Sequence, residues 1–278
     1  MRVACVVSHM DELTVTAAVQ TIAKSGGGSF SLNRVVAGKT PMSASFNAAL
    51  DIALDADCDV LVHTASDVLL QRHAIAVLLN TLDLNTHYLA VARGYDSIHG
   101  FGTGGLWAFN MHVIGDRFRF RDVFKQDLDL CMRVEAETGL VRSYTPKNDP
   151  LTYHHPIWTA RELYGKFRYS YPKYEKESAQ ESMTAFLREG LKLNPSNKAL
   201  LAGRMGLEAA QRSGAVPGAK DQHQIDLEFA RDCSGLETTG KEFYVKHGYY
   251  LKFAQGLLDS DETCIPGEDE PGVPFVMP

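Results

Sequence analysis

The chain has 278 residues, of which 45% are hydrophobic and 22% charged, and its formal net charge is −6. This length and composition suit a soluble globular protein with one large domain, or with one large and one smaller domain. The acidic balance argues against nucleic-acid binding, which needs a surplus of lysine and arginine to displace the counterions of the phosphate backbone. An anionic ligand would have to meet local basic groups.

The five cysteines lie far apart and none belongs to a Cys-x-x-Cys pair, so the sequence suggests neither a disulfide framework nor a thiolate zinc site. The first residues, MRVACVVSHM, lead into a strand-like run without the layout of a signal peptide. No uninterrupted apolar stretch reaches the roughly 18 residues that a membrane span needs. We therefore expect a cytoplasmic protein without a transmembrane segment.

The first hundred residues alternate between short apolar runs and amphipathic segments. Residues 2–8 predict a buried strand, and a helix follows it up to the glycines of SGGG at 25–28. The same pattern predicts a strand, a helix, a strand, a helix and a strand at 30–38, 43–57, 58–63, about 71–82 and about 87–92. Such alternation is typical of an α/β fold with a mainly parallel central sheet.

The alternation ends near residue 94, where RGYDSIHGFGTGG predicts a glycine-rich loop. After it, QDLDLCMRVEAETG predicts a helix, and residues 140–146 predict a strand. From residue 178 almost every segment has a helical pattern. One of them, LKLNPSNKALLAGRMGLEAAQRSG, is slightly similar to a tetratricopeptide unit, but a single copy favours a plain helical region. We expect a domain at 1–150, an ordered arm or lid at 151–177, a helical region at 178–258 and an extended tail at 259–278.

Ligands of open α/β sheets bind beyond the carboxyl ends of the strands. The loops after the first three predicted strands are SHMDE, AGKTPMS and TASDV, and neither GxGxxG after the first strand nor GxxxxGK[ST] anywhere occurs. Asp67, in the third loop, is placed to ligate a divalent cation that bridges two phosphates. Its structural alternative is to cap a helix that starts near residues 69–72.

Four stretches in this order resemble the family 2-like glycosyltransferases of the GT-A fold, over roughly residues 2–157. They are VACVVSHMDELTVTAAVQTI, FNAALDIALDADCDVLVHTASD, GFGTGGLWAFN and KQDLDLCMRVEAETG. The resemblance implies a nucleotide-sugar-binding and catalytic domain at 1–150, with a C-terminal α-helical region that the minimal family lacks. It implies transfer of a hexose-like sugar from a UDP- or GDP-linked donor to a hydroxyl of a glycan or another acceptor.

The resemblance aligns Asp67 with the second carboxylate of the family's DxD motif and Ala65 with the first. Since one carboxylate is missing, a cation would need another ligand, and the resemblance suggests His154 or His155. Imidazole, carboxylate and diphosphate oxygens suit manganese, so the expected cofactor is Mn²⁺ or Mg²⁺. A structural histidine pair is the alternative. The sequence DAD at 55–57 spells the motif but precedes the predicted strand, at the wrong edge of the sheet.

Asp127 matches the family's catalytic aspartate, which would deprotonate the acceptor hydroxyl. Its neighbour Gln126 stands where the family usually has glutamate. The structural alternative is that Asp127 and Asp129 are favourable charges at a helix N-terminus.

The other expected contacts with the nucleotide or the sugar lie near the same loops. Each has an ordinary structural alternative, such as helix capping, a turn or a solvated side chain. They are Ser8, Met10, Glu12, Gly38, Lys39, Asn47, Ser66, Gly104 and Gly105. Trp107 could stack on a sugar or pack in the core. The basic and tyrosine residues Arg161, Tyr164, Lys166, Arg168 and Tyr169 could cover a diphosphate or form a solvated helix face.

Two other functions stay open. A nucleotidyltransferase would carry a glycine-rich basic loop after the first strand, and SHMDELT has neither feature. A degenerate GT-A domain could serve as a non-catalytic binding or scaffold protein, which Ala65 and Gln126 favour. In an enzyme, the helical region would shape acceptor specificity or form a homo-oligomer contact.

Overall fold

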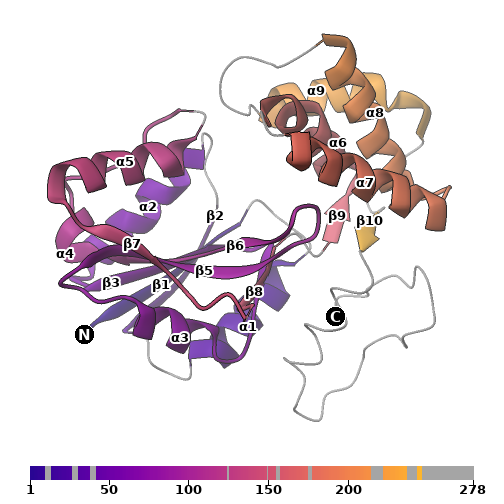
Figure 1. Cartoon of the computed structure of the whole chain (residues 1–278). Coiled ribbons are helices and arrows are strands. Elements are labelled where there is room, and N and C mark those ends of the chain that lie inside the picture. Colours follow the sequence, from indigo (N-terminus) through magenta and orange to yellow (C-terminus); the bar gives the residue numbers. More distant parts are fainter. Residues whose placement is uncertain are drawn as a thin grey trace. The chain divides into compact units, whose positions relative to one another are not determined.

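The computed structural model describes residues 1–9, 14–26, 31–37, 42–123, 125–148, 150–154, 157–174, 177–213, 222–236 and 243–245. They form two compact units, each described by itself (Figure 1). The sheet unit contains the described residues of 1–96 and 101–155, and the helical unit contains those of 97–100 and 156–251. Five expected site residues lie outside the described residues: Met10, Glu12, Gly38, Lys39 and His155.

The sheet unit is built on a mixed sheet whose main path runs β2-β1-β3-β6-β5-β8-β4, with β7 paired to β5. β1 is parallel to β2 and β3, and β5 is parallel to β7 and β8, whereas β6 runs antiparallel to β3 and β4 antiparallel to β8. The expected α/β fold is therefore confirmed. The strands are β1 Val3–His9, β2 Leu32–Ala37, β3 Val60–Ala65, β4 Val68–Leu70, β5 His87–Asp96, β6 Gly100–Asn110, β7 Val141–Tyr144 and β8 Thr152–His154.

Helices cover both faces of this sheet, which explains its continuous apolar strands. Alternate residues of β1 enter two different apolar clusters, because successive side chains of a strand point to opposite faces. Ala4 and Val6 pack with α2 and α5, and Val7 packs with α1 and α3. These helices and the short α4 are α1 Val15–Gly26, α2 Met42–Asp55, α3 Ala74–Thr81, α4 Met111–Ile114 and α5 Gln126–Thr138.

Two parts of the sheet unit differ from the sequence prediction. The glycine-rich stretch expected as a loop is mostly strand, since β5 continues to Asp96 and β6 starts at Gly100. Backbone hydrogen bonds to neighbouring strands outweigh the weak strand propensity of glycine there. Residues Val68–Leu70 form β4 where a helix was expected to start, and α3 begins only at Ala74. The capping role for Asp67 is therefore wrong, because the residues that follow it form a strand.

The range 151–177, expected as an arm, contains β8 of the sheet unit and the first elements of the helical unit. In the helical unit, β10 pairs antiparallel with β9, and the helices enclose a separate apolar cluster that includes Leu163, Phe167, Leu187 and Leu200. Its elements are β9 Ile157–Thr159, α6 Ala160–Gly165, the π-helical turn η1 Lys166–Ser170, η2 Tyr171–Lys173, α7 Glu177–Leu193, α8 Lys198–Ser213, α9 Gln222–Asp232, η3 Ser234–Leu236 and β10 Phe243–Val245.

Three of the residues considered as a diphosphate lid contact acidic side chains of α9. The buried Arg168 donates to Glu228 at 2.8 Å. Arg161 donates to Asp226 at 2.9 Å, and the Tyr164 hydroxyl donates to Asp232 at 2.6 Å. Removing one partner of the buried Arg168–Glu228 pair would cost about 3–5 kcal/mol of stability. The Arg161–Asp226 pair is half exposed and contributes much less.

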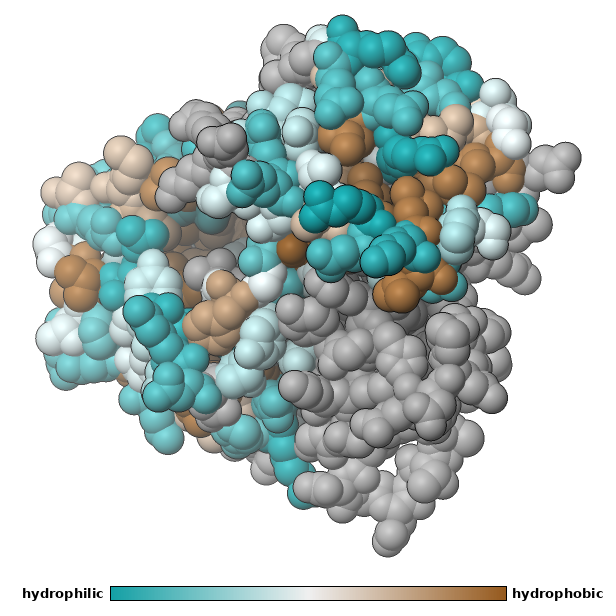
Figure 2. Space-filling view, turned by 45° about the vertical axis from the view of Figure 1, so that its right-hand side comes forward, coloured by the Kyte–Doolittle hydropathy of each residue, from teal (hydrophilic) through white to brown (hydrophobic). Residues whose placement is uncertain are grey.

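Hydrophilic side chains cover most of the described surface in the view of Figure 2, with smaller apolar patches between them. Among the described residues, no helix combines the length and the apolar character that crossing a membrane requires.

A buried histidine should make the stability of the sheet unit depend on pH. Burial lowers the pKa of His63 to about 3, and its Nε2 lies 3.0 Å from Ser8 Oγ. In the unfolded chain the ring regains its ordinary pKa of about 6.5, so the unfolded state takes up a proton first as the pH falls. Lowering the pH from 7 to 5 should cost about 2 kcal/mol of unfolding free energy through this group alone.

Urea unfolding at the two pH values measures this cost. His63→Gln, which keeps a hydrogen-bonding group but does not titrate in this range, should lose about 2 kcal/mol less than the parent chain on acidification. An equal loss in both proteins would contradict the assignment.

Candidate active site

The candidate site starts at β8, the short strand inserted between β4 and β5. Its register places His154 opposite Val68 of β4 and opposite Asp96 of β5. Gly94 makes the close approach of β8 feasible, because a Cβ atom there would lie 2.0 Å from Thr152 Oγ1. The backbone pairing of β8 therefore fixes where the imidazole lies.

The imidazole of His154 lies between two carboxylates. Its Nε2 is 3.5 Å from Asp67 Oδ2, and its Nδ1 is 3.2 Å from Asp96 Oδ2. Burial opposes the charged imidazolium, but Asp67 and Asp96 outweigh it and raise the pKa of His154 to about 9. The structure thus brings together the two predicted ligands Asp67 and His154. It adds Asp96, which the sequence analysis missed because only the pairing of β5 with β8 reveals it.

To bind the expected cation, His154 would have to give up the proton that the two carboxylates stabilise on its ring. Histidines that bind metals usually donate their other ring N–H to a carboxylate, which fixes the tautomer. Asp96 is placed to accept from Nδ1, which leaves Nε2 on the side of Asp67. Among the described residues, no group of three or more histidine, cysteine or acidic side chains could hold a metal by itself. Asp67 and His154 would therefore need further ligands from water or from a diphosphate.

The backbone of β6 forms a wall of this cluster at Gly105. This residue has a φ of +70°, and a Cβ atom on it would lie 2.9 Å from Val68 Cγ2 and 3.7 Å from His154 Cδ2. Its carbonyl accepts a hydrogen bond from Thr64 Oγ1 at 3.1 Å. Glycine is required here both by the backbone conformation and by the space. The neighbouring Gly104 also lies in β6.

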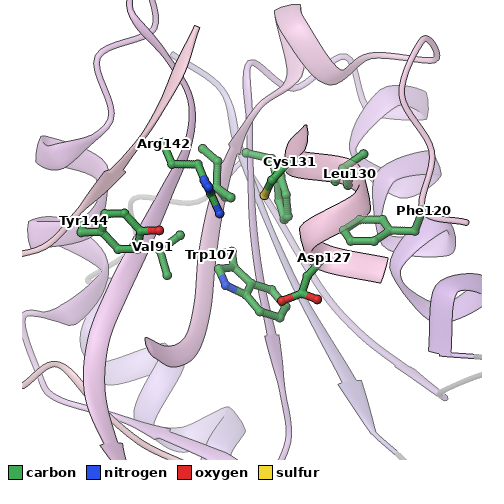
Figure 3. Close-up of a pocket in the computed structure, with 10 residues that line it drawn as sticks. Val91, Trp107, Phe120, Asp127, Leu130, Cys131, Arg142 and Tyr144 are labelled. Atoms are coloured by element: carbon green, nitrogen blue, oxygen red, sulfur yellow. The ribbon is translucent and has the colours of Figure 1, made fainter. Parts of the chain in front are cut away.

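A pocket opens on the sheet face that α5 covers, with about 500 Å³ of space that includes some open solvent (Figure 3). Its lining combines an apolar floor with a few polar groups, as is usual for small-molecule sites. The floor consists of Leu89, Val91, Trp107, Phe109, Phe120, Leu130 and Cys131, and the polar groups are Asp127, Arg142 and Tyr144.

The first turn of α5 carries two aspartates with different roles. Asp129 forms a 2.9 Å ion pair with Arg133 and lies 3.9 Å from Arg121. Asp127 is exposed and lines the pocket, and its carboxylate points toward Trp107 in Figure 3. The structural role at the helix N-terminus therefore fits Asp129, and Asp127 is the carboxylate that a ligand can reach.

Three side chains expected to contact the nucleotide are engaged in the protein interior. The amide of Asn47 exchanges two 2.9 Å hydrogen bonds with the backbone of Phe120, and so positions a pocket residue. Ser66 is fully buried. Ser8, also buried, bonds to His63. These side chains therefore have structural partners or positions in the sheet unit, and their contact with a nucleotide stays a prediction.

Two other aromatic rings pack against the indole of Trp107. His63 stacks on it with ring centroids 6.0 Å apart and planes 9° apart, and Phe46 lies 5.2 Å away. Trp107 and Gly105 are separated by one residue of β6 and lie about 7 Å apart along that strand. The carboxylate–histidine cluster and the pocket are therefore neighbours on the same strand.

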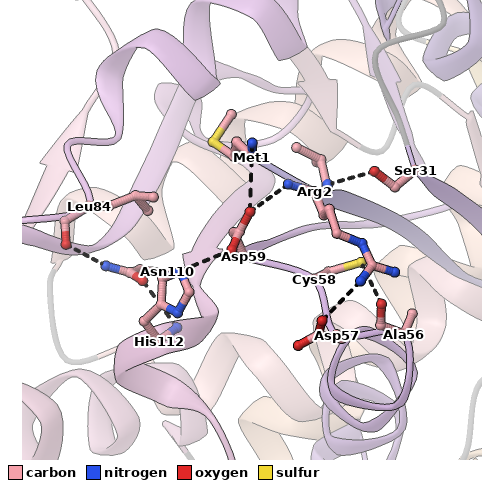
Figure 4. A network of polar contacts seen from close by, with 11 residues as sticks. Met1, Arg2, Ser31, Ala56, Asp57, Cys58, Asp59, Leu84, Asn110 and His112 are labelled. Carbon is pink, nitrogen blue, oxygen red and sulfur yellow. Dashed lines mark hydrogen bonds and ion pairs between the residues drawn. The ribbon is translucent and has the colours of Figure 1, made fainter.

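The sequence DAD at 55–57, which spells the DxD motif, lies before the first residue of β3, at the end of the strand opposite to Asp67 (Figure 4). Arg2 Nη1 contacts Asp57 Oδ2 at 2.9 Å, and Asp59 accepts from the Arg2 backbone N–H at 2.6 Å. His112 Nε2 lies 3.1 Å from the other oxygen of Asp59. As expected, this acidic sequence precedes the strand and binds the N-terminal segment, whereas Asp67 follows the strand.

No family model and no curated protein matches the chain. Among solved structures, S. aureus TarS 1-349 in complex with UDP is similar with a TM-score of 0.42 and 10% identity, over 78% of this chain and 93% of that one. A glycosyltransferase involved in the glycosylation of the major capsid of PBCV-1 is similar with a TM-score of 0.35 and 9% identity, over 55% and 93%. A197 from STIV has a TM-score of 0.38 and 12% identity, over 53% and 83%.

Removing the carboxylate of Asp96, which contacts Nδ1 of His154, should weaken the proposed cation binding. Asp96→Asn is expected to lower the affinity for Mn²⁺ by about 10- to 100-fold in the presence of UDP, because the imidazole loses the group that orients it. Electron paramagnetic resonance of free Mn²⁺ measures this affinity without any turnover. Asp116→Asn, at an exposed site in the same unit, should bind as the parent does. Equal affinity in the parent and Asp96→Asn would contradict the role of Asp96.

Proposed function

We propose that this protein is a glycosyltransferase that moves a sugar from a UDP- or GDP-linked donor to an acceptor hydroxyl. One observation carries the proposal. β6 contributes Gly105 to the wall of the carboxylate–histidine cluster and Trp107 to the floor of the pocket. Gly105 and Trp107 lie about 7 Å apart along β6, so a diphosphate at the first and an acceptor at the second would bind at neighbouring positions of one strand. Such proximity is what direct group transfer between two bound substrates needs.

On the donor side, Asp67 and His154 would hold a divalent cation, Mn²⁺ or Mg²⁺. That cation would offset the negative charge of the diphosphate and make it a better leaving group. Asp96 would keep the Nε2 atom of His154 directed at the cation. Without the carboxylate that Ala65 replaces, the site depends on His154 for its second protein ligand.

On the acceptor side, Asp127 would take the proton of the acceptor hydroxyl. The acceptor oxygen then forms a bond with the anomeric carbon of the donor sugar. The bond between that carbon and the diphosphate oxygen breaks, and the nucleoside diphosphate leaves with the electron pair. Asp127 is suited to this step because, among the described residues, it makes no hydrogen bond or ion pair and lies open to the pocket.

A non-catalytic scaffold remains the second candidate function, because Ala65 lacks the first carboxylate of DxD. The other departure from the family, Gln126, argues for it less than the sequence suggested. Gln126 is buried and does not line the pocket. Its lack of charge therefore removes no group that a ligand could reach.

The two aspartates of α5 give a matched test of the catalytic step. Asp127→Asn should lower kcat by about 10²- to 10⁴-fold, because asparagine cannot accept the proton, and should leave binding of the nucleotide sugar almost unchanged. Asp129→Asn removes a carboxylate two residues away and should keep most of the activity, with a modest loss of stability from the Arg133 pair. Release of UDP or GDP, coupled to an acceptor panel, measures kcat. Equal activity of Asp127→Asn and the parent would rule out Asp127 as the base.

A further inference from the structure

We infer that the pocket between α5 and strands β5, β6 and β7 binds one uncharged sugar ring, so that the acceptor of this enzyme is a neutral saccharide. The inference rests on the proposed function and specifies the acceptor that it leaves open. Three features of the pocket carry it: a fixed aromatic floor, hydrogen-bonding groups on opposite walls, and a charge balance that disfavours anions.

The floor offers a rigid apolar platform. Trp107 is supported by His63 and Phe46, and His63 is itself held by its 3.0 Å contact with Ser8. Phe109 and Phe120 continue the apolar surface beside it. A pyranose has one face made of C–H groups, and a fixed aromatic surface can bury that face with little ordering of side chains on binding.

The walls offer a planar donor and a carboxylate acceptor. The guanidinium of Arg142 is anchored because its Nε donates to Glu135 Oε1 at 2.8 Å, and the Tyr88 hydroxyl donates to the same oxygen at 2.9 Å. The remaining N–H groups of Arg142 face the pocket, across from the carboxylate of Asp127 (Figure 3). A ring hydroxyl both donates and accepts, so a polyhydroxylated ring can satisfy both walls at once.

The charged groups of the pocket disfavour anionic ligands and purely apolar ligands. Glu135 offsets the charge of Arg142, and Asp127 adds a negative charge to the pocket. A phosphate or carboxylate between Arg142 and Asp127 would meet a guanidinium already paired with Glu135 and the like charge of Asp127. A purely apolar ring would desolvate Arg142 and Asp127 and give them no partner, which costs free energy. A neutral ring with hydroxyl groups avoids both costs.

Tyr144, the last residue of β7, lies at the edge of the pocket. Its ring lies under the guanidinium of Arg93, whose Cζ is 5.1 Å from the ring centroid. This contact orients Tyr144 so that its hydroxyl lies at the pocket, where Figure 3 shows it. Tyr144 thus adds a neutral polar group to the pocket lining, and the guanidinium of Arg93 lies against its ring.

The test titrates the purified full chain with neutral methyl glycosides of glucose, galactose, mannose and N-acetylglucosamine, and with methyl glucuronide and glucose 6-phosphate as charged counterparts. Tryptophan fluorescence reports on the pocket, because Trp107 lines it whereas Trp158 is only 2% exposed. At least one neutral glycoside should bind with millimolar affinity, as expected for so few heavy atoms, and protect Trp107 from acrylamide quenching. Its charged counterpart should bind at least about tenfold more weakly.

Two arginine variants form a matched pair for this titration. Arg142→Gln should weaken glycoside binding by about tenfold or more, because it removes the planar donor. Arg117→Gln removes a comparable 3.0 Å ion pair with Glu137 of α5, the helix that also carries Glu135. This pair lies outside the pocket lining, so the variant should bind glycosides as the parent does. Circular dichroism checks that both variants fold, and the ligand panel on the parent chain tests the inference without any variant.

The outcomes separate this inference from the proposed function. Charged sugars that bind as tightly as neutral ones would overturn it. So would the absence of glycoside binding up to roughly 100 mM in a chain that binds a nucleotide sugar, and the proposed function would then stand. Neutral glycosides that bind to a chain without affinity for any nucleotide sugar would support the sugar pocket and overturn the transferase.

Discussion

The pairing of β8 with both β4 and β5 is the constraint on which the candidate site depends. It places the His154 ring between Asp67, in the turn before β4, and Asp96, at the end of β5. The close approach of β8 rests on Gly94, where any side chain would collide with Thr152. A backbone feature with no functional group of its own therefore determines the geometry of the polar cluster.

β6 connects this cluster to the pocket. The strand runs antiparallel to β3 and presents Gly105 to the cluster and Trp107 to the pocket, and the packing of apolar side chains on both faces of the sheet holds it in place. His63, which is held by its contact with Ser8, stacks on the indole of Trp107. Two sites with different chemistry are thus fixed to one rigid strand, which makes their separation nearly independent of loop motion.

Much of the fold was predictable from local patterns. The alternating apolar and amphipathic segments predicted the α/β fold, because their periods report directly on burial. The hairpin of β5 and β6 and the short strand β4 were missed, since glycine content and a three-residue run carry little local signal and long-range pairing decides them. Long-range pairing also explains which residues of the candidate site the sequence did not reveal. Asp67, His154 and Asp127 stood out beside recognisable motifs, whereas Asp96 and Arg142 matter only through partners on other elements. Asn47 bonds to the backbone of Phe120, a contact that the sequence pattern does not reveal.

The proposed function depends most on a cation that Asp67 and His154 would hold and that would bind the diphosphate of the donor sugar. Isothermal titration calorimetry of UDP- and GDP-sugars against the parent chain and Asp67→Asn, with and without Mn²⁺, tests this most directly. We expect the parent chain to bind one of these donors in a Mn²⁺-dependent manner, and Asp67→Asn to lose the dependence on Mn²⁺ together with most of the affinity. No binding of any nucleotide sugar under any condition, or equal binding by both proteins, would contradict it.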